Sequence, residues 1–198
     1  MDKSRYGRVV NKNYLQSCAK NDALSHYRGA VLSKTDSIEV KTSIKIEFQN
    51  TPFLLSFKKV KGLNKRFSCY DIFKYQDHLW KRLGYRERIF NTGVRLIYHF
   101  IDNRFFFGEL FFSDASKVNI ELVALSLIKK YTDHKTVPSK NFQITGKDAF
   151  IFFENTGINI SIKYIFTGDE SINRNLQTIS EYSPFTKTET KNDLEELL

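Results

Sequence analysis

Two runs of alternating residues, joined by a pair of turn-forming residues, constrain the fold more than any other part of this sequence. Between residues 94 and 101 apolar side chains recur at every second position, and residues 105–112 return with phenylalanine at positions of both parities. Asp102 and Asn103 lie between the two runs and tolerate the left-handed backbone of a two-residue turn. The pattern predicts an antiparallel hairpin whose second strand is central in a sheet or covered on both faces.

The same period of two predicts two further strand pairs. Each pair consists of alternating segments separated by residues that favour turns. The predicted pairs are residues 38–48 with residues 53–57 across a turn at 49–52, and residues 149–154 with residues 158–166 across a turn at 155–157, after a short strand at 142–144.

Residues 68–83 are predicted to form a helix, because their apolar side chains follow a helical spacing. Ser68 is the expected N-cap, since its hydroxyl accepts an N–H group of the first turn, and Gly84 is the expected stop. Trp80 is expected to pack into the core. The apolar stripe of this helix consists of Cys69, Ile72, Phe73, Leu79, Trp80 and Leu83.

A second helix is predicted to end near Tyr131, with Ser116 or Asp114 as its N-cap. Glu121 lies near its start and two lysines lie near its end, as the helix dipole favours. Its apolar stripe consists of Ile120, Val123, Ala124, Leu127, Ile128 and Tyr131.

This order of elements, ββα, ββα, ββ, predicts an α+β protein. We expect one antiparallel sheet of about six strands, built from three hairpins, with the two main helices packed on one face. The alternative is a half-barrel of the same strands around one helix. The segment Y-x-F-x-D-N at 98–103, followed by an amphipathic helix, is similar to the pattern of many small bacterial domains and identifies no family.

Three regions follow from this interpretation. Residues 38–166 are predicted to form a single α+β domain. Residues 1–37 form a basic N-terminal segment that is expected to be partly helical, through Tyr14 to Ala19. Residues 167–198 form a polar, acidic tail that is expected to be mobile, because its apolar content is low.

Basic residues are concentrated in the first half of the chain. The sequence contains 31 Lys and Arg against 22 Asp and Glu, a net charge of +9, and residues 1–90 carry 19 of these basic residues and 8 of the acidic ones. A charged stretch with interleaved aromatic residues at 58–88 is the candidate binding site for a partner or a polyanion. A solvated surface explains the same charges. The candidate residues are Lys58, Lys59, Lys61, Lys65, Arg66, Lys81, Arg82, Arg86 and Arg88.

Motifs that carry chemistry are not found in the sequence. Its four histidines are isolated from one another, and we predict no metal site, no cofactor and no catalytic residues. His99 is interpreted as a structural histidine within a strand. The cysteines, Cys18 and Cys69, are interpreted as small apolar packing groups, which predicts a reducing, cytoplasmic compartment. No secretory signal and no membrane-spanning segment is predicted.

These observations favour a non-catalytic macromolecule-binding module, an adaptor, inhibitor or immunity-type protein that acts through a protein–protein surface. The alternative is an accessory protein that binds RNA or DNA through the basic stretch 58–88. An enzyme whose site is assembled from distant residues is a third hypothesis. The identity of the partner and the oligomeric state do not follow from the sequence.

Overall fold

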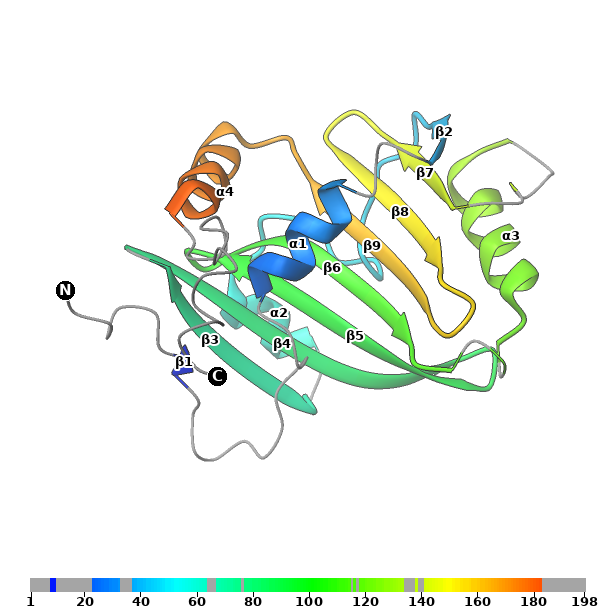
Figure 1. Ribbon diagram of the computed structural model, residues 1–198, viewed down its shortest axis with the longest axis horizontal. Coiled ribbons are helices and arrows are strands. Elements are labelled where there is room, and N and C mark those ends of the chain that lie inside the picture. Colours follow the sequence, from blue (N-terminus) through cyan, green and yellow to red (C-terminus); the bar gives the residue numbers. More distant parts are fainter. Residues whose placement is uncertain are drawn as a thin grey trace, which may run out of the picture.

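One mixed β-sheet with helices on both of its faces organises the part of the chain that the structure describes (Figure 1). The structure is a computed structural model, and it describes residues 8–9, 23–32, 37–63, 67–75, 77–114, 116, 118–133, 138 and 141–182. The elements are β1 (Arg8–Val9), α1 (Ala23–Leu32), β2 (Ile38–Lys41), α2 (Phe57–Leu63), β3 (Cys69–Tyr75), β4 (His78–Ile89), β5 (Thr92–Ile101), β6 (Arg104–Phe112), α3 (Ile120–Tyr131), β7 (Phe142–Thr145), β8 (Ala149–Asn155), β9 (Ile160–Phe166) and α4 (Glu170–Tyr182).

The sheet has nine strands among the described residues, in the order β1-β3-β4-β5-β6-β9-β8-β7-β2. All neighbouring strands pair antiparallel except β2 and β7, which are parallel. The protein is therefore α+β, as the sequence predicts. The expectation of an antiparallel sheet of about six strands holds only in part. The segment predicted as the first helix supplies two further strands, and β2 pairs with β7 in parallel.

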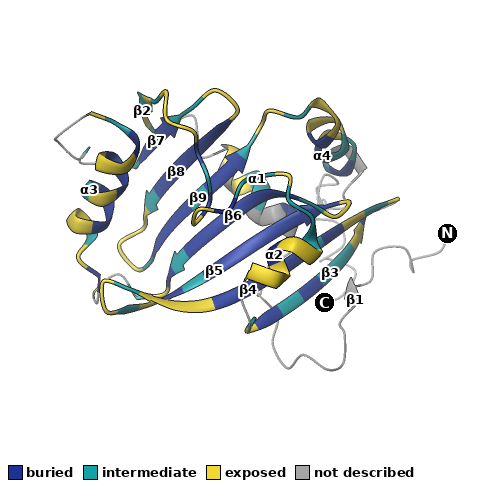
Figure 2. Cartoon of the chain, turned by 180° about the vertical axis from the view of Figure 1, so that it is seen from behind, coloured by how far each residue is buried: buried dark blue, intermediate teal, exposed yellow. Residues whose placement is uncertain are grey.

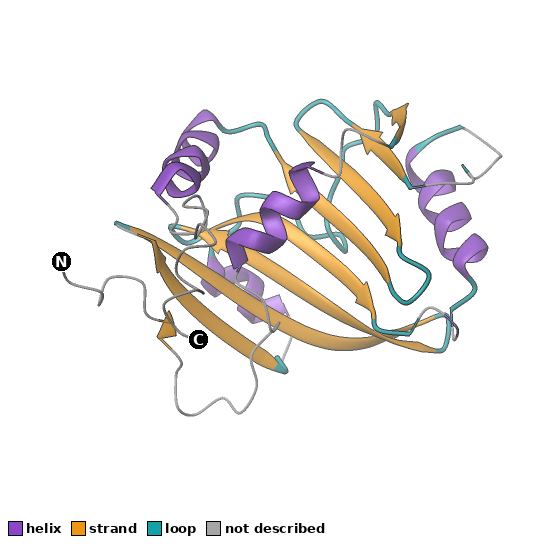
Figure 3. Cartoon of the chain, viewed as in Figure 1, coloured by secondary structure: helices purple, strands orange, loops and turns teal. Residues whose placement is uncertain are grey.

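Apolar side chains cover both faces of this sheet, and each face packs against different helices. On the α2 face, strand residues such as Leu83 and Tyr98 pack with Val60 of α2 and with the apolar side of α3. On the opposite face, the α4 face, Trp80 and Phe107 pack with apolar residues of α1 and α4. Figure 3 shows α1 and α4 in front of the sheet, and Figure 2 shows α2 on the reverse side. The expectation that the helices share one face is therefore wrong.

The segment between β2 and α2 crosses the α2 face and is held there by Phe48. The Phe48 ring is fully buried and lies directly on Gly108 of β6, where an added Cβ would meet ring carbons at 2.4 to 2.7 Å. Only glycine leaves room for this approach. The ring also packs edge-on against Tyr98 and Tyr164, with centroid separations of 4.8 and 5.2 Å.

The central hairpin and the second helix are confirmed. β5 and β6 are joined by Asp102 and Asn103, both with positive φ, as the two-residue turn requires. The second helix, α3, spans Ile120–Tyr131, but its N-cap is Asn119, whose side-chain oxygen accepts the Leu122 N–H at 2.9 Å. The hairpin of β8 and β9 is confirmed as well, with Gly157 at φ +81° in its turn.

The predicted helix at 68–83 is wrong, because these residues form the β3–β4 hairpin. Ser68, the expected N-cap, instead donates its backbone N–H to the carbonyl of Gly84, the expected stop, at 2.7 Å. The segment is rich in aromatic residues, which favour strands, and it carries buried side chains on both of its faces. Trp80 is buried as expected, although it lies on a strand.

The first predicted strand pair is also corrected. Only Ile38–Lys41 of residues 38–48 forms a strand, β2. After Lys41 the Thr42 hydroxyl accepts the Ile44 N–H and the chain leaves the sheet. Residues 53–57 do not form a strand; α2 begins at Phe57.

The C-terminal tail is ordered over its first part, which corrects the expectation of mobility for residues 170–182. Here α4 buries Ile172, Leu176 and Ile179 against the α4 face. Asp169 caps this helix, because its carboxylate accepts the N–H groups of Ser171 and Ile172 at 2.9 and 3.0 Å. Residues 183–198 lie outside the described residues, as does the predicted N-terminal helix at 14–19.

Candidate functional site

The sheet divides the basic residues singled out in the sequence between its two faces. Successive side chains of a strand point to opposite faces, so odd-numbered residues of β4 lie on the α2 face and even-numbered ones on the α4 face. Lys81 therefore lies on the α2 face, whereas Arg82, Arg86 and Arg88 lie on the α4 face. Lys65 and Arg66 lie outside the described residues.

Five lysines gather around α2 on the α2 face, and we call them the lysine cluster. Three are exposed on α2, a helix without an acidic residue, and two come from the neighbouring strands β3 and β4. The ammonium group of Lys81 lies 5.3 Å from the centroid of the Phe57 ring, which ties β4 to the start of α2. The cluster consists of Lys58, Lys59, Lys61, Lys74 and Lys81.

Aromatic rings beneath the lysine cluster are occupied by contacts within the protein. Phe57 packs edge-on against Phe100, with centroids 5.2 Å apart, and packs at a tilt against Tyr70 at 5.3 Å. Lys61 lies over the ring of Phe67 at 5.2 Å. These rings hold α2 against the sheet through contacts with other side chains. They therefore do not present free faces on which nucleic-acid bases could stack.

An apolar pocket lies beside the start of α2 on this same face. It has a volume of about 400 Å³ and is formed by the segment before α2, the turn between β7 and β8, and the end of β9. Phe53 and Phe166 stack within it at a centroid separation of 5.2 Å. Ile44 and Leu54 line the pocket with exposed side chains, at 49% and 40% exposure. Sequence reasoning missed this pocket, because it placed residues 38–57 in two regular strands.

Leu54 has an unusual backbone conformation, with φ at +69°. Its N–H donates to the carbonyl of Phe105 at 2.8 Å, and the Phe105 N–H donates to the carbonyl of Leu55 at 3.0 Å. A left-handed conformation costs a leucine on the order of 1–2 kcal/mol, and these two hydrogen bonds to β6 hold it in place. The strained backbone presents an apolar side chain at the edge of a pocket.

Arg82 has a structural role on the α4 face. It is almost fully buried, and its Nε and terminal nitrogen donate to one carboxylate oxygen of Asp71 at 3.1 and 2.8 Å. Burial lowers the pKa of Arg82, while the charge and hydrogen bonds of Asp71 oppose that shift. Removing either partner would leave a buried charge without its counter-ion, so this arginine is not available to bind a ligand.

His99 is held between two partners, as the interpretation of a structural histidine predicts. The indole N–H of Trp80 donates to Nδ1 of His99 at 3.1 Å, which leaves Nε2 to carry the proton and donate to Glu109 at 3.1 Å. His99 and Trp80 are fully buried, and Glu109 nearly so. The group resembles an orienting acid and base, but its burial separates it from any substrate.

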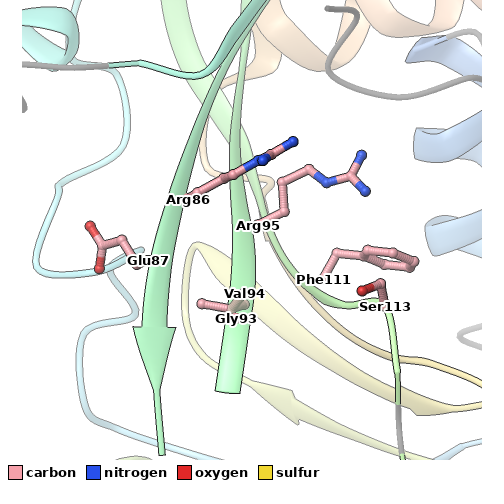
Figure 4. Close-up of a pocket in the computed structure, with 7 residues that line it drawn as sticks. All are labelled: Arg86, Glu87, Gly93, Val94, Arg95, Phe111 and Ser113. Carbon is pink, nitrogen blue, oxygen red and sulfur yellow. The ribbon is translucent and has the colours of Figure 1, made fainter. Parts of the chain in front are cut away.

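Arg86 lines a second pocket, on the α4 face at the end of β4, together with Arg95, which sequence reasoning did not single out (Figure 4). The two arginines are direct cross-strand partners, and their side chains extend from the same side of the strands. The guanidinium of Arg95 lies 5.4 Å from the centroid of the Phe111 ring. The other described lining residues are Glu87, Gly93, Val94 and Ser113, and Glu87 points to the other side of the sheet (Figure 4).

The three carboxylates that are available near strand ends have partners in the fold. Asp102 accepts from His78 and from the Leu79 N–H, and Asp114 accepts from Ser116. Glu154 accepts from Ser161 and Lys163. Among the described residues, no group of three or more His, Cys, Asp and Glu side chains is placed to hold a metal ion.

Cys69 is disulfide-bonded, which corrects its interpretation as a small apolar packing group. The other cysteine of the sequence, Cys18, lies outside the described residues. Disulfide bonds are rare in reducing compartments, so the bond argues against the reducing environment that the cysteines were taken to indicate. A cytoplasmic location stays a prediction. Alkylation in freshly lysed cells, under denaturing conditions and without reductant, tests it. Denaturation exposes the buried Cys69, and its thiol is expected to be labelled if the protein is cytoplasmic.

The protein is therefore an α+β protein that has a basic surface with an apolar pocket on one face of its sheet and an arginine pair on the other. No protein-family model, no curated protein and no solved structure matches the chain. In the described part of the chain, no helix is both long and apolar enough to cross a membrane.

Proposed function

We propose that the protein is a non-catalytic binding module that recognises an acidic segment of another protein through its α2 face. The proposal rests on one observation: on this face an apolar pocket adjoins α2, a helix whose charged residues are all lysines. Leu54, at the pocket, precedes Lys58 of α2 by four residues, so one extended segment reaches both.

The pocket supplies the anchor of such an interaction. Binding energy at protein interfaces is concentrated in a few large side chains that fill apolar pockets. Exposed Ile44 and Leu54 extend the apolar surface of the cavity towards solvent, and contiguous exposed apolar surface marks interaction sites. An aromatic or branched aliphatic side chain of the partner fits this environment.

The lysine cluster supplies charge selectivity. Lysines at the edge of an interface attract acidic partners, accelerate association and reject basic partners. Because the neighbouring rings are packed against the protein, the arrangement favours an acidic protein segment over a single-stranded nucleic acid. Binding of RNA or DNA is the alternative that the experiment must separate.

The experiment uses a fluorescein-labelled peptide in which one tryptophan is flanked by Asp and Glu residues. Fluorescence anisotropy compares it with the same peptide carrying alanine for tryptophan, and with labelled single-stranded and duplex DNA. We expect the tryptophan peptide to bind at least tenfold more tightly than the alanine peptide. Tight DNA binding without peptide binding would establish the alternative, and binding of neither would overturn the proposed surface.

Two protein variants assign the binding to this face. Charge reversal by Lys58→Glu with Lys59→Glu is expected to weaken peptide binding, whereas Lys129→Glu with Lys130→Glu, on exposed positions of α3, is expected to leave it unchanged. If the protein instead binds duplex DNA, the double α2 variant is expected to flatten the salt dependence by a log–log slope of about 1.8, or about 0.9 per contact.

Leu54→Asn distinguishes a binding role from a structural one. Asparagine adopts the left-handed conformation more readily than leucine and removes the exposed apolar group. We therefore expect the free energy of unfolding to be unchanged or higher, while peptide affinity falls. A variant that is destabilised and binds normally would show that Leu54 serves the fold and not a partner.

A further inference from the structure

We propose that two copies of this protein associate through β2, which pairs antiparallel with β2 of the second copy and joins the two sheets into one. This interface does not depend on the function proposed for the α2 face. The backbone direction and the charges of β2 together select a second copy of this chain as the partner.

β2 is an edge strand in the described part of the chain. It is the last strand in the order of the sheet, and β7 is its neighbour there (Figure 1). Ile38, Glu39 and Lys41 are exposed. A strand at the edge of a sheet presents N–H and C=O groups with which another strand can pair. The opposite edge of the described sheet is β1, which has only two residues, so β2 offers the longer edge to a partner.

The hydrogen bonds to the β7 side show which backbone groups of β2 point outwards. The N–H groups of Ile38 and of Thr42, which follows β2, donate to carbonyls at the two ends of β7, at 3.3 and 2.9 Å. The backbone groups of successive residues in a strand point alternately to its two sides. The N–H and C=O groups of Glu39 and Lys41 therefore point away from β7, towards the edge.

One register pairs these outward groups and opposite charges at the same time. Directly opposed residues of an antiparallel pair exchange both of their N–H···O bonds, so an outward-pointing residue must face another one. When Glu39 lies opposite Lys41 of the second copy, the two-fold axis places Lys41 opposite Glu39 of that copy as well. A shift by two residues would instead place Glu39 opposite Glu39, or Lys41 opposite Lys41, and like charges in these positions repel each other. β2 is therefore complementary to itself.

The charged side chains of β2 are available for this pairing. One oxygen of the Glu39 carboxylate accepts the Thr145 hydroxyl at 2.7 Å, which holds the carboxylate beside the strand on the α4 face. A carboxylate accepts several hydrogen bonds, so Glu39 can also receive the ammonium group of Lys41 from the second copy. Neither Glu39 nor Lys41 is joined to another described residue by an ion pair.

The apolar side chains of β2 add a contact on the α2 face. Ile38 and Val40 lie on that face, because their partners in β7 belong to its core. In the proposed register Val40 lies opposite Val40 of the second copy, with Ile38, which is 46% exposed, at the next position on the same face. The pairing thus covers apolar surface on one face and forms two ion pairs on the other.

The contact is small, because each copy contributes a strand of four residues. Interfaces that bury less than about 1,200 Å² are typical of weak, transient complexes. We therefore expect the protein to be monomeric at micromolar concentration and to form dimers as the concentration approaches millimolar. Salt screens exposed charges, so the dimer is expected to weaken as the ionic strength rises.

The test is sedimentation velocity of the full-length protein from micromolar to millimolar concentration. Glu39→Lys and Lys41→Glu each place like charges opposite one another at both symmetric pairs, so each is expected to lower the association constant at least about tenfold. The control variant carries Glu121→Lys with Arg174→Glu, on exposed positions of α3 and α4, and is expected to associate like the unaltered protein.

Mixing the two single variants gives the sharpest result. One variant then carries two lysines and the other two glutamates at these positions, so opposite charges face each other again, and the mixture is expected to associate within about threefold of the unaltered protein. If a single variant does not fold by circular dichroism, the double variant Glu39→Lys with Lys41→Glu replaces it, because it restores both pairs within one chain. The proposal is overturned if the unaltered protein stays monomeric at millimolar concentration, if the folded single variants associate normally, or if neither the mixture nor the double variant associates.

Discussion

Gly108 and Phe48 provide the sharpest test of how the α2 face is assembled. In Gly108→Ala the new Cβ would lie 2.4 Å from the nearest Phe48 ring carbon. Carbon atoms in contact are normally about 3.5–4.0 Å apart, so the ring must move by about 1 Å. Tyr98 and Tyr164 flank the ring and restrict that movement. We expect the substitution to lower the free energy of unfolding by about 2–3 kcal/mol, the upper part of the range for overpacked cores.

Removing the Phe48 ring also removes the clash with an added Cβ at position 108. Phe48→Ala alone is expected to cost about 3–5 kcal/mol, because it empties a fully buried site. In the double variant the Cβ added at position 108 enters the vacated space and costs almost nothing, so the two substitutions are less than additive by about 2 kcal/mol. Urea denaturation, followed by linear extrapolation, measures all four corners of this cycle.

Gly93→Ala is the matched control, because a Cβ at Gly93 meets no atom within 4 Å and its backbone is ordinary. It is expected to change stability by less than about 0.5 kcal/mol. Additivity of the Gly108 and Phe48 substitutions within about 0.5 kcal/mol would refute the reasoning. The segment that carries Leu54 would then be held across the sheet by something other than this contact.

Three other changes test the α4 face by urea denaturation. Burial raises the pKa of Glu154, but the hydrogen bonds and charge of Lys163 outweigh burial and lower it. Its contribution to stability is therefore complete above its unfolded pKa of about 4.3 and is lost as the pH falls further; Glu154→Gln is expected to remove that part of the acid sensitivity. Trp80→Phe leaves His99 without its N–H donor and is expected to cost about 1–3 kcal/mol, whereas an unchanged stability would contradict the hydrogen bond. Truncation after Gly168 removes three buried side chains of α4 and is expected to cost several kcal/mol, whereas truncation after Tyr182 is expected to change stability little.

The elements that were predicted correctly have signals that lie within a few residues. Asp102 and Asn103 adopt positive φ more readily than most residues. With the turn placed at these two residues, the alternating segments on either side can pair as antiparallel strands in only one register. The second helix likewise carries its apolar stripe and its charges within one segment. Its cap was misplaced by a few residues, because Asn119 satisfies the first turn as well as serine or aspartate does.

The β3–β4 hairpin was missed because its pattern depends on partners that are distant in the sequence. Both faces of these strands carry buried side chains, so the simple alternation of a half-exposed strand is absent. Arg82 was assigned to a solvated helix face, whereas it pairs with Asp71 across two strands and both side chains are buried. The sequence alone does not show that a charged residue will be buried beside a residue of opposite charge.

Four of the five residues of the lysine cluster are among the candidate residues singled out in the sequence, and their role in binding stays a prediction. Lys58, Lys59 and Lys61 stay together because a short helix carries them, and Lys81 joins them from β4. The other described basic residues of the stretch separate from this group, because a strand sends successive side chains to opposite faces whereas a loop or helix does not. The apolar pocket beside them was missed for a different reason. It combines three segments that lie far apart in the sequence, and no local pattern marks such a combination.

The arginine pair, by contrast, follows from one local feature. Phe90 and Asn91 both have positive φ and join β4 to β5 in a two-residue turn. Once that turn is placed, antiparallel pairing puts residues equally distant from it opposite one another, and Arg86 then faces Arg95. The sequence Phe90-Asn91-Thr92-Gly93 therefore contains the information that positions the pair. A change that shifts this turn by one residue, such as an insertion after Asn91, would therefore separate the two arginines without altering either.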